Sequence, residues 1–195
     1  MAITPEGSLH PGFESEVIQY LERHGFLTAS ATYHMVMPPE VVEILKRRYS
    51  PTALYIRGRA DRIAISQPPR KFEFEFECKT HESKTRFDLC IEMLPFVHHL
   101  IKEALGVKCL YAYLDHMGRQ RGFWVGNGIP IRQVLIAEKW QSENDFFFPK
   151  IAKKFFPDSN LKFNMKSSMG TDDPFIVIDQ SVVNQLPDWR ALICE

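Results

Sequence analysis

Two acids and a lysine, Asp61, Glu77 and Lys79, are the residues of this sequence best suited to catalysis. Glu77 and Lys79 lie near the end of the stretch KFEFEFECKT at 71–80, which alternates aromatic and charged residues. A period of two predicts a strand, and it puts Glu77 and Lys79 on one face with α-carbons about 6.6 Å apart. Asp61 precedes the stretch RIAIS, and a turn at Pro68-Pro69 lets the two stretches pair. We therefore expect Asp61 to lie near Glu77.

Two neighbouring carboxylates suit a hard divalent cation such as Mg²⁺, which takes carboxylate, water and phosphate oxygens. The Lys79 ammonium beside them would orient an attacking water and stabilise negative charge on phosphorus. The other acids of the strand, Glu73 and Glu75, are expected on its solvent face. Cys78 has the parity of the phenylalanines and is expected to be a core thiol. Glu92 and His98-His99 have no spacing typical of a metal site, so surface or core roles are expected for them.

Asp61, fifteen intervening residues and then Glu77-Cys78-Lys79 resemble the D…(D/E)xK motif of the PD-(D/E)XK nucleases. This superfamily includes restriction enzymes, Holliday junction resolvases and recombination exonucleases. The resemblance covers residues 12–115 and implies Mg²⁺-dependent hydrolysis of phosphodiester bonds, with Mn²⁺ able to substitute and DNA favoured over RNA. Ala60 stands where the name-giving proline would be, and the stretch 87–105 lacks a glutamine found in several branches. The branch is therefore left unassigned.

The resemblance also implies an acid contributed to the metal site by the first helix, expected over residues 13–24. Two residues compete for this role. Glu14 lies on the same stripe as Val17 and Ile18, which is the stripe expected to face the sheet. Glu16 shares the outer face with more polar neighbours. We favour Glu14 as the third acid.

A nucleic-acid partner would need a local basic patch, because the formal net charge is +0 and the pI is about 7.1. Such a rim for phosphates could be formed around the motif, with a scattered charged surface as the alternative. The residues concerned are Arg59, Arg62, His81, Lys84 and Arg86. His81 shares parity with Glu77 and Lys79, although a surface histidine just past a strand is the more common case.

The order of helical and strand patterns predicts an α/β fold with a mixed central sheet flanked by helices, as in the restriction-endonuclease-like core. We expect a single domain over 1–195, with a core at 12–125 and a less legible C-terminal extension at 126–195. Helices are expected at 13–24, 38–49, 87–105, 130–140 and the C-terminus, and strands at 53–66, 71–80, 107–114, 121–125 and 175–179.

The composition limits which other classes of protein the chain can belong to. Hydrophobic residues make up 45% and charged residues 25%, which is typical of a folded globular chain. No apolar run approaches the roughly 20 residues that a membrane-spanning helix needs. The four cysteines form no CxxC pair, so free thiols and a reducing compartment such as the cytoplasm are expected. The stretch FFFPKIAKKFFP at 146–157 favours a core or oligomer interface over base stacking, which would accommodate a homodimer.

These patterns favour a metal-dependent deoxyribonuclease. The first alternative is a catalytically inactive nuclease-fold protein that acts as a nucleic-acid-binding or assembly module. The second alternative is an unrelated α/β interaction protein whose Phe/Glu strand is merely amphipathic. The intact set of Asp61, Glu77 and Lys79 argues against the first, and a metal titration separates the nuclease from both.

Overall fold

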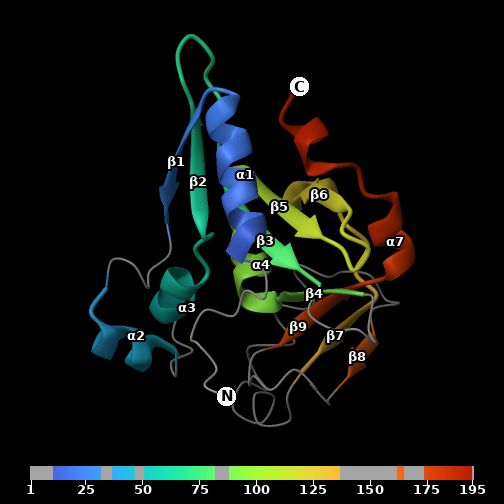
Figure 1. Cartoon of the computed structure of the whole chain (residues 1–195). Helices are drawn as coiled ribbons and strands as arrows, with labels where there is room; N and C mark the ends of the chain where they lie inside the picture. The colour runs from blue at the N-terminus through green and yellow to red at the C-terminus, as the bar shows by residue number, and fades with distance from the viewer. Residues whose placement is uncertain are drawn as a thin grey trace.

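The protein folds into two β-sheets with helices packed against them (Figure 1). The computed structural model describes residues 11–31, 37–46, 51–81, 88–136, 162–164 and 174–194. Five strands form the first sheet in the order β1-β2-β3-β5-β6, and four form the second in the order β4-β9-β7-β8. Both sheets contain parallel and antiparallel pairs. The expected mixed α/β class with flanking helices is therefore confirmed.

The first sheet carries the motif strands. It consists of β1 (Phe26–Ser30), β2 (Arg62–Ser66), β3 (Glu73–Thr80), β5 (Cys109–Leu114) and β6 (Gln120–Trp124). β2 and β3 pair antiparallel through the turn containing Pro68 and Pro69, as the sequence predicted. β3 and β5 pair parallel, and the helix α4 (Met93–Ala104) lies between them along the chain. This is the strand, helix and strand connection that parallel neighbours require.

One face of the first sheet is covered by α1 (Pro11–Arg23), which ends before Gly25 with its positive φ of 82°. Phe13, Val17 and Leu21 of this helix pack against the phenylalanine face of β3. The phenylalanine face is therefore buried, which is the parity that the alternating sequence predicted. Burial of side chains of this size contributes about 1.5–3 kcal/mol each.

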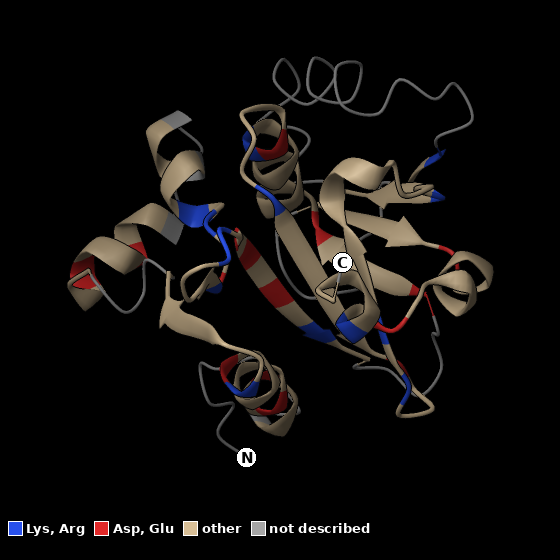
Figure 2. Cartoon of the chain, turned by 90° about the horizontal axis from the view of Figure 1, so that it is seen from above, with Lys and Arg blue, Asp and Glu red and all other residues tan. Residues whose placement is uncertain are grey.

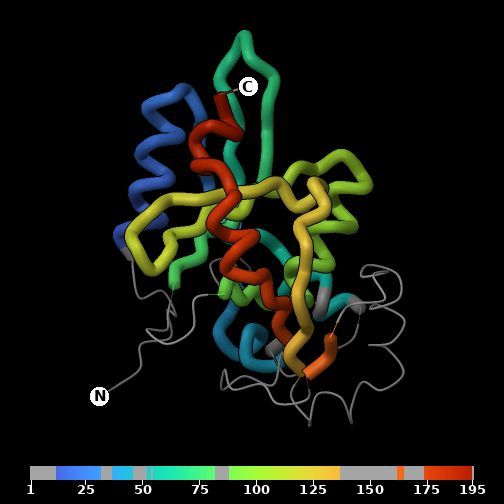
Figure 3. The backbone as a smooth tube through the Cα atoms, turned by 90° about the vertical axis from the view of Figure 1, so that its right-hand side faces the viewer, coloured from blue at the N-terminus to red at the C-terminus, as the bar shows by residue number. Residues whose placement is uncertain are grey.

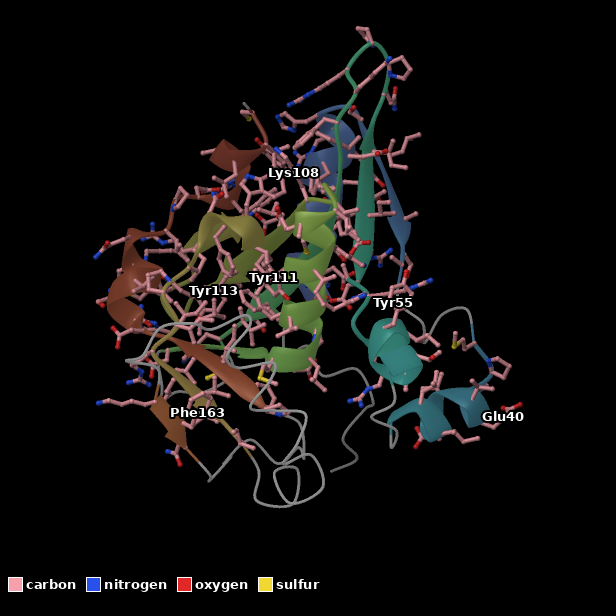
Figure 4. All side chains as sticks on the ribbon, turned by 180° about the vertical axis from the view of Figure 1, so that it is seen from behind. Glu40, Tyr55, Lys108, Tyr111, Tyr113 and Phe163 are labelled. Carbon is pink, nitrogen blue, oxygen red and sulfur yellow. The ribbon has the colours of Figure 1, made fainter. Side chains whose placement is uncertain are left out.

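The opposite face of the first sheet is covered by α4. Met93, Phe96 and Val97 pack there with Tyr111 and Tyr113 of β5. Figure 4 shows both tyrosines on the strand beside this helix. A helix had been expected from residue 87, but the structure has β4 (Leu89–Glu92) before α4. The strand forms because β4 pairs antiparallel with β9 (Phe175–Ile178), a partner far along the chain.

The C-terminal segment returns to the first sheet (Figure 3). After β9 come α7 (Gln180–Gln185) and the short helix η3 (Trp189–Leu192). Trp189 is fully buried and lies against Gly122 of β6. A Cβ at Gly122 would lie 2.8 Å from the Trp189 α-carbon, so only glycine permits this approach. The predicted strand at 175–179 and the C-terminal helix are both confirmed.

Of two further predicted elements, one is right only in its second half and the other is wrong. A strand had been expected over 53–66, but the structure has the helix α3 (Pro51–Arg57) followed by β2. Pro51 occupies the first helical position, and buried Ala53 packs inward, so tertiary packing overrides the β-propensity of this stretch. A helix had been expected over 130–140, whereas β7 (Gln133–Leu135) pairs with β9 and with β8 (Lys162–Asn164).

Other expectations are met in part or lie outside the described residues. The second helix, α2, spans Pro39–Lys46, and the remainder of its predicted range is not described. The aromatic and basic stretch 146–157 also lies outside the described residues. The four cysteines are free thiols. In the part of the chain that the structure describes, no helix is both long enough and apolar enough to cross a membrane.

Candidate active site

The pairing of β2 with β3 positions the two motif acids. Arg62 is the register partner of Phe76, and extending this antiparallel register by one residue brings Asp61 opposite Glu77. Both acids have the parity that faces α4, away from the buried phenylalanines. The carbonyl of Asp61 accepts a hydrogen bond of 2.9 Å from the backbone N–H of Ala31, which fixes the chain at the start of β2. The structure therefore brings Asp61 and Glu77 together as predicted from sequence.

Lys79 completes the group from the same face of β3. Its Nζ lies 3.2 Å from Oε2 of Glu77, and the exposed fractions of the two side chains are 29% and 5%. The Glu77 side chain is therefore buried, whereas the Lys79 side chain is half-buried. The charged positions of this central strand are visible in Figure 2. An anionic ligand can approach the lysine without disrupting the core.

The electrostatics of the group are dominated by crowding of like charge in a buried place. Burial raises the pKa of Glu77 well above its ordinary value, Lys79 opposes this, and the charge and hydrogen bond of Asp61 raise it further. Burial alone would lower the pKa of Lys79, but the charges of Glu77, Glu92 and Asp61 outweigh it and raise that pKa. Lys79 therefore remains an ammonium, while the acid pair would gain from a nearby cation.

The helix α4 supplies polar groups to this face that were not expected from sequence. Glu75, predicted on the solvent face, instead forms an ion pair with Lys102, whose Nζ lies 2.6 Å from Oε2. His99 is fully buried, and its Nδ1 lies 2.9 Å from the hydroxyl oxygen of Tyr111. Tyr111 is the register partner of Glu77 on the neighbouring strand. These polar groups of α4 could have been predicted to act together, because His99 and Lys102 are three residues apart and therefore share one helix face.

Glu14 forms an ion pair with Arg62. Its Oε1 accepts a hydrogen bond of 2.7 Å from Nε of Arg62. Arg62 has the parity of the phenylalanine face, beside α1, whereas Asp61 and Glu77 have the opposite parity. Glu14 is half-buried, whereas Glu16 is exposed. Glu16 accepts a hydrogen bond of 2.5 Å from Gln120. The structure does not bring Glu14 into contact with the acid pair.

The expected basic rim is partly described. Arg59 is exposed, and Arg62 forms an ion pair with Glu14. His81 follows β3, with Nδ1 at 3.4 Å from the Tyr113 hydroxyl and its ring 5.4 Å from that of His116. Burial, followed by the charge of His116, lowers the pKa of His81, so this histidine is neutral at neutral pH. Lys84 and Arg86 lie outside the described residues.

The residues present fit a cation that brings part of its own coordination sphere. Among the described residues, no three side chains of His, Cys, Asp or Glu converge as a complete ligand set. Mg²⁺ does not need such a set, because it is usually held by one or two carboxylates together with waters and phosphate oxygens. Asp61 and Glu77 offer two carboxylates of the right chemistry. Their mutual repulsion is the feature that a cation would relieve.

Comparisons with known proteins add a distant similarity. No family model matches the chain, and no curated protein matches it either. Among solved structures the chain is similar to Hjc, a Holliday junction resolvase from the archaeal hyperthermophile Archaeoglobus fulgidus, with a TM-score of 0.46 and 12% identity. The similarity covers 93% of this chain and 96% of that one. At this level the similarity decides nothing about chemistry, so function is proposed from the residues themselves.

Proposed function

We propose that this protein is a metal-dependent nuclease that hydrolyses phosphodiester bonds in DNA. One observation carries the proposal: Asp61, just before β2, and Glu77 of β3 share a face with an ammonium 3.2 Å from the Glu77 carboxylate. A charge pair kept only for stability does not need a second acid beside a buried one, because that acid raises the cost of ionising it. The added carboxylate is useful when a cation is bound.

Asp61 and Glu77 would hold the divalent cation, Mg²⁺ with Mn²⁺ as a substitute. When bound, such a cation supplies charge neutralisation for a phosphate oxygen and a lowered pKa for water. Lys79 keeps its proton and therefore acts as a hydrogen-bond donor and positive charge. Its ammonium would orient the attacking water and stabilise the extra negative charge that develops on phosphorus. The burial of Glu77 keeps this carboxylate in a fixed position during the reaction.

Binding of the nucleic acid would use basic groups close to the acid pair in the sequence, together with His81, which is neutral at neutral pH and can donate one hydrogen bond. The residues proposed to contact phosphates are Arg59, Arg62, His81, Lys84 and Arg86. Because the net charge of the chain is +0, attraction must come from this local group rather than from the whole surface. Arg62 would contact a phosphate only by leaving or sharing its ion pair with Glu14. Glu14 could in turn approach the site as a third acid.

The test is incubation of the protein with labelled single-stranded, duplex and branched DNA, and with matched RNA, in Mg²⁺, Mn²⁺ or EDTA. We expect cleavage of DNA that requires the divalent ion and disappears in Asp61→Asn. Binding without cleavage by any substrate would favour the inactive nucleic-acid-binding module. Cleavage that persists at an equal rate in EDTA, or in Asp61→Asn, would refute the proposal.

A further inference from the structure

The charged row of β3 is matched by polar groups along α4. Lys102 contacts Glu75, and one turn away His99 contacts Tyr111, which is the register partner of Glu77. The α-carbons of Glu75 and Glu77 are about 6.6 Å apart on a strand. Lys102 and His99 are separated by about 4.5 Å along a helix. Lys102 therefore meets a charged residue of β3 directly, and His99 meets the register partner of the next charged residue.

His99 has a hydrogen-bonding group that the fold does not use. The side chain is fully buried, and only Nδ1 is engaged, by the Tyr111 hydroxyl at 2.9 Å. Its Nε2 has no hydrogen-bond partner among the described residues. The nearby Gly58 carbonyl is already bonded by Nδ1 of His98 at 2.5 Å. Leaving a buried polar atom unpaired costs about 1–3 kcal/mol, so this arrangement needs a reason.

The hydrogen-bonded pair of His99 and Tyr111 has one donor proton that the bond between them does not use. Burial, followed by the charges of Lys102, His98 and Lys79, lowers the pKa of His99 to about 3, so the ring is neutral with one donor and one acceptor. Burial raises the pKa of Tyr111 well above its ordinary value, so the hydroxyl keeps its proton. When the ring proton is on Nε2, the Gly58 carbonyl, already bonded by His98, is the acceptor on that side. When the ring proton is on Nδ1, the ring donates to the Tyr111 hydroxyl oxygen, and the hydroxyl proton is left for a further acceptor.

We propose that Tyr111 and His99 are positioning residues that orient the Glu77 carboxylate for cation binding. This inference rests on the proposed function. Glu77 is the register partner of Tyr111 on the adjacent strand, so it is the carboxylate that we assign to the Tyr111 hydroxyl as acceptor. A neutral donor can fix the carboxylate and leave its negative charge available to the metal ion. A second positively charged side chain would instead compete with the metal ion for that carboxylate. Groups that orient a metal ligand in this way typically contribute about 10–100-fold to metal affinity.

The test is a Mn²⁺ titration of the full chain, with the free ion followed by its EPR signal. Tyr111→Phe removes only the hydroxyl and keeps the ring stacked on Phe123, whose centroid lies 5.3 Å away. We expect Tyr111→Phe to weaken Mn²⁺ binding about 10-fold. The matched control is Tyr113→Phe, which loses a hydroxyl from the same face of the same strand but next to His81. This control should bind Mn²⁺ as the wild type does.

Two substitutions of His99 separate orientation from packing. His99→Asn keeps a polar group near the position of Nδ1 and should remain within about threefold of wild-type affinity, whereas His99→Leu should lose about 10-fold. Equal Mn²⁺ affinity in wild type, Tyr111→Phe and His99→Leu would overturn this inference alone, provided that Asp61→Asn abolishes binding. No Mn²⁺ binding by the wild type would overturn both the inference and the proposed metal site.

Discussion

Acidification should destabilise this protein through His99. The pKa of this histidine is lowered from 6.5 to about 3, because the ring is fully buried and lies near the positive charges of Lys102, His98 and Lys79. The unfolded chain therefore binds a proton below pH 6.5 that the folded chain refuses. Stability from this source is complete above that pH and is lost progressively as the pH falls toward about 3.

The size of the effect follows from the two pKa values. At about pH 5 the unfolded state is favoured by roughly 1.4 kcal/mol for each pH unit below its own pKa, which gives about 2 kcal/mol. At about pH 7.5 the same contribution is less than about 0.1 kcal/mol. For a chain of this size, a loss of 2 kcal/mol lowers the melting temperature by about 4–8 °C.

The assay compares wild type with His99→Asn, which cannot titrate. Urea unfolding of both proteins at about pH 7.5 and about pH 5 gives the stability lost by each on acidification. We expect the wild type to lose about 2 kcal/mol more than the variant, since the other titrating groups are common to both. Equal losses in the two proteins would show that His99 is protonated in the folded state, and would refute its placement in a buried, positively charged layer.

Three further predictions concern the acid pair, the C-terminal packing and the basic rim. Asp61→Asn should raise the melting temperature in EDTA, because it removes a charge that repels Glu77. It should also erase the increase of about 3–6 °C that Mg²⁺ at about ten times its dissociation constant produces in wild type. A lower melting temperature in EDTA with a full Mg²⁺ response would contradict this prediction. Gly122→Ala should lower the free energy of unfolding in denaturant by about 2–3 kcal/mol, because the new Cβ meets the Trp189 backbone. Gly12→Ala has open space around its Cβ and should not lower it. Removing the charges of Arg59 and Arg62 should reduce the salt slope of DNA binding by about one unit for each lost contact, and an unchanged slope would place the interface elsewhere.

The elements that sequence predicted well are those with a strong local pattern. The Phe/acid alternation of β3 fixed its register and its buried face, and the turn at Pro68-Pro69 predicted its pairing with β2. The α1 helix follows from its apolar stripe and from Gly25 after its last residue. These features depend on neighbours within a few residues. A period of two or 3.6 is therefore sufficient to recognise them.

The elements that sequence missed depend on distant partners. β4 and β7 are three- or four-residue strands whose pairing is made by β9, near the end of the chain. Nothing local distinguishes such short apolar runs from a helix. α3 was missed for the opposite reason, because its β-branched and aromatic residues suggested a strand while packing and Pro51 favoured a helix. In these three segments, tertiary contacts rather than local propensity determine the secondary structure.

The candidate site could be predicted from sequence in its centre but not in its surroundings. Parity and one turn were enough to place Asp61, Glu77 and Lys79 on a single face. The layer above them was not foreseen, since Glu75 was expected in solvent and His99 had no recognised partner. The helix stripe alone does not say which strand face it will cover. Glu14 remains a predicted third acid, with Arg62 as its partner in the structure.

The central claim is tested most directly by the rate of Mg²⁺-dependent DNA cleavage in two matched variants of β3. Glu77→Gln and Glu73→Gln remove the same charge from the same strand, but only Glu77 is buried beside Asp61 and Lys79, while Glu73 is exposed. We expect Glu77→Gln to lower the rate about 1000-fold or more, in line with the several kcal/mol that a metal ligand contributes. Glu73→Gln should cleave at the wild-type rate. Similar rates for both variants would contradict the assignment of Glu77 and the acid pair as the catalytic centre.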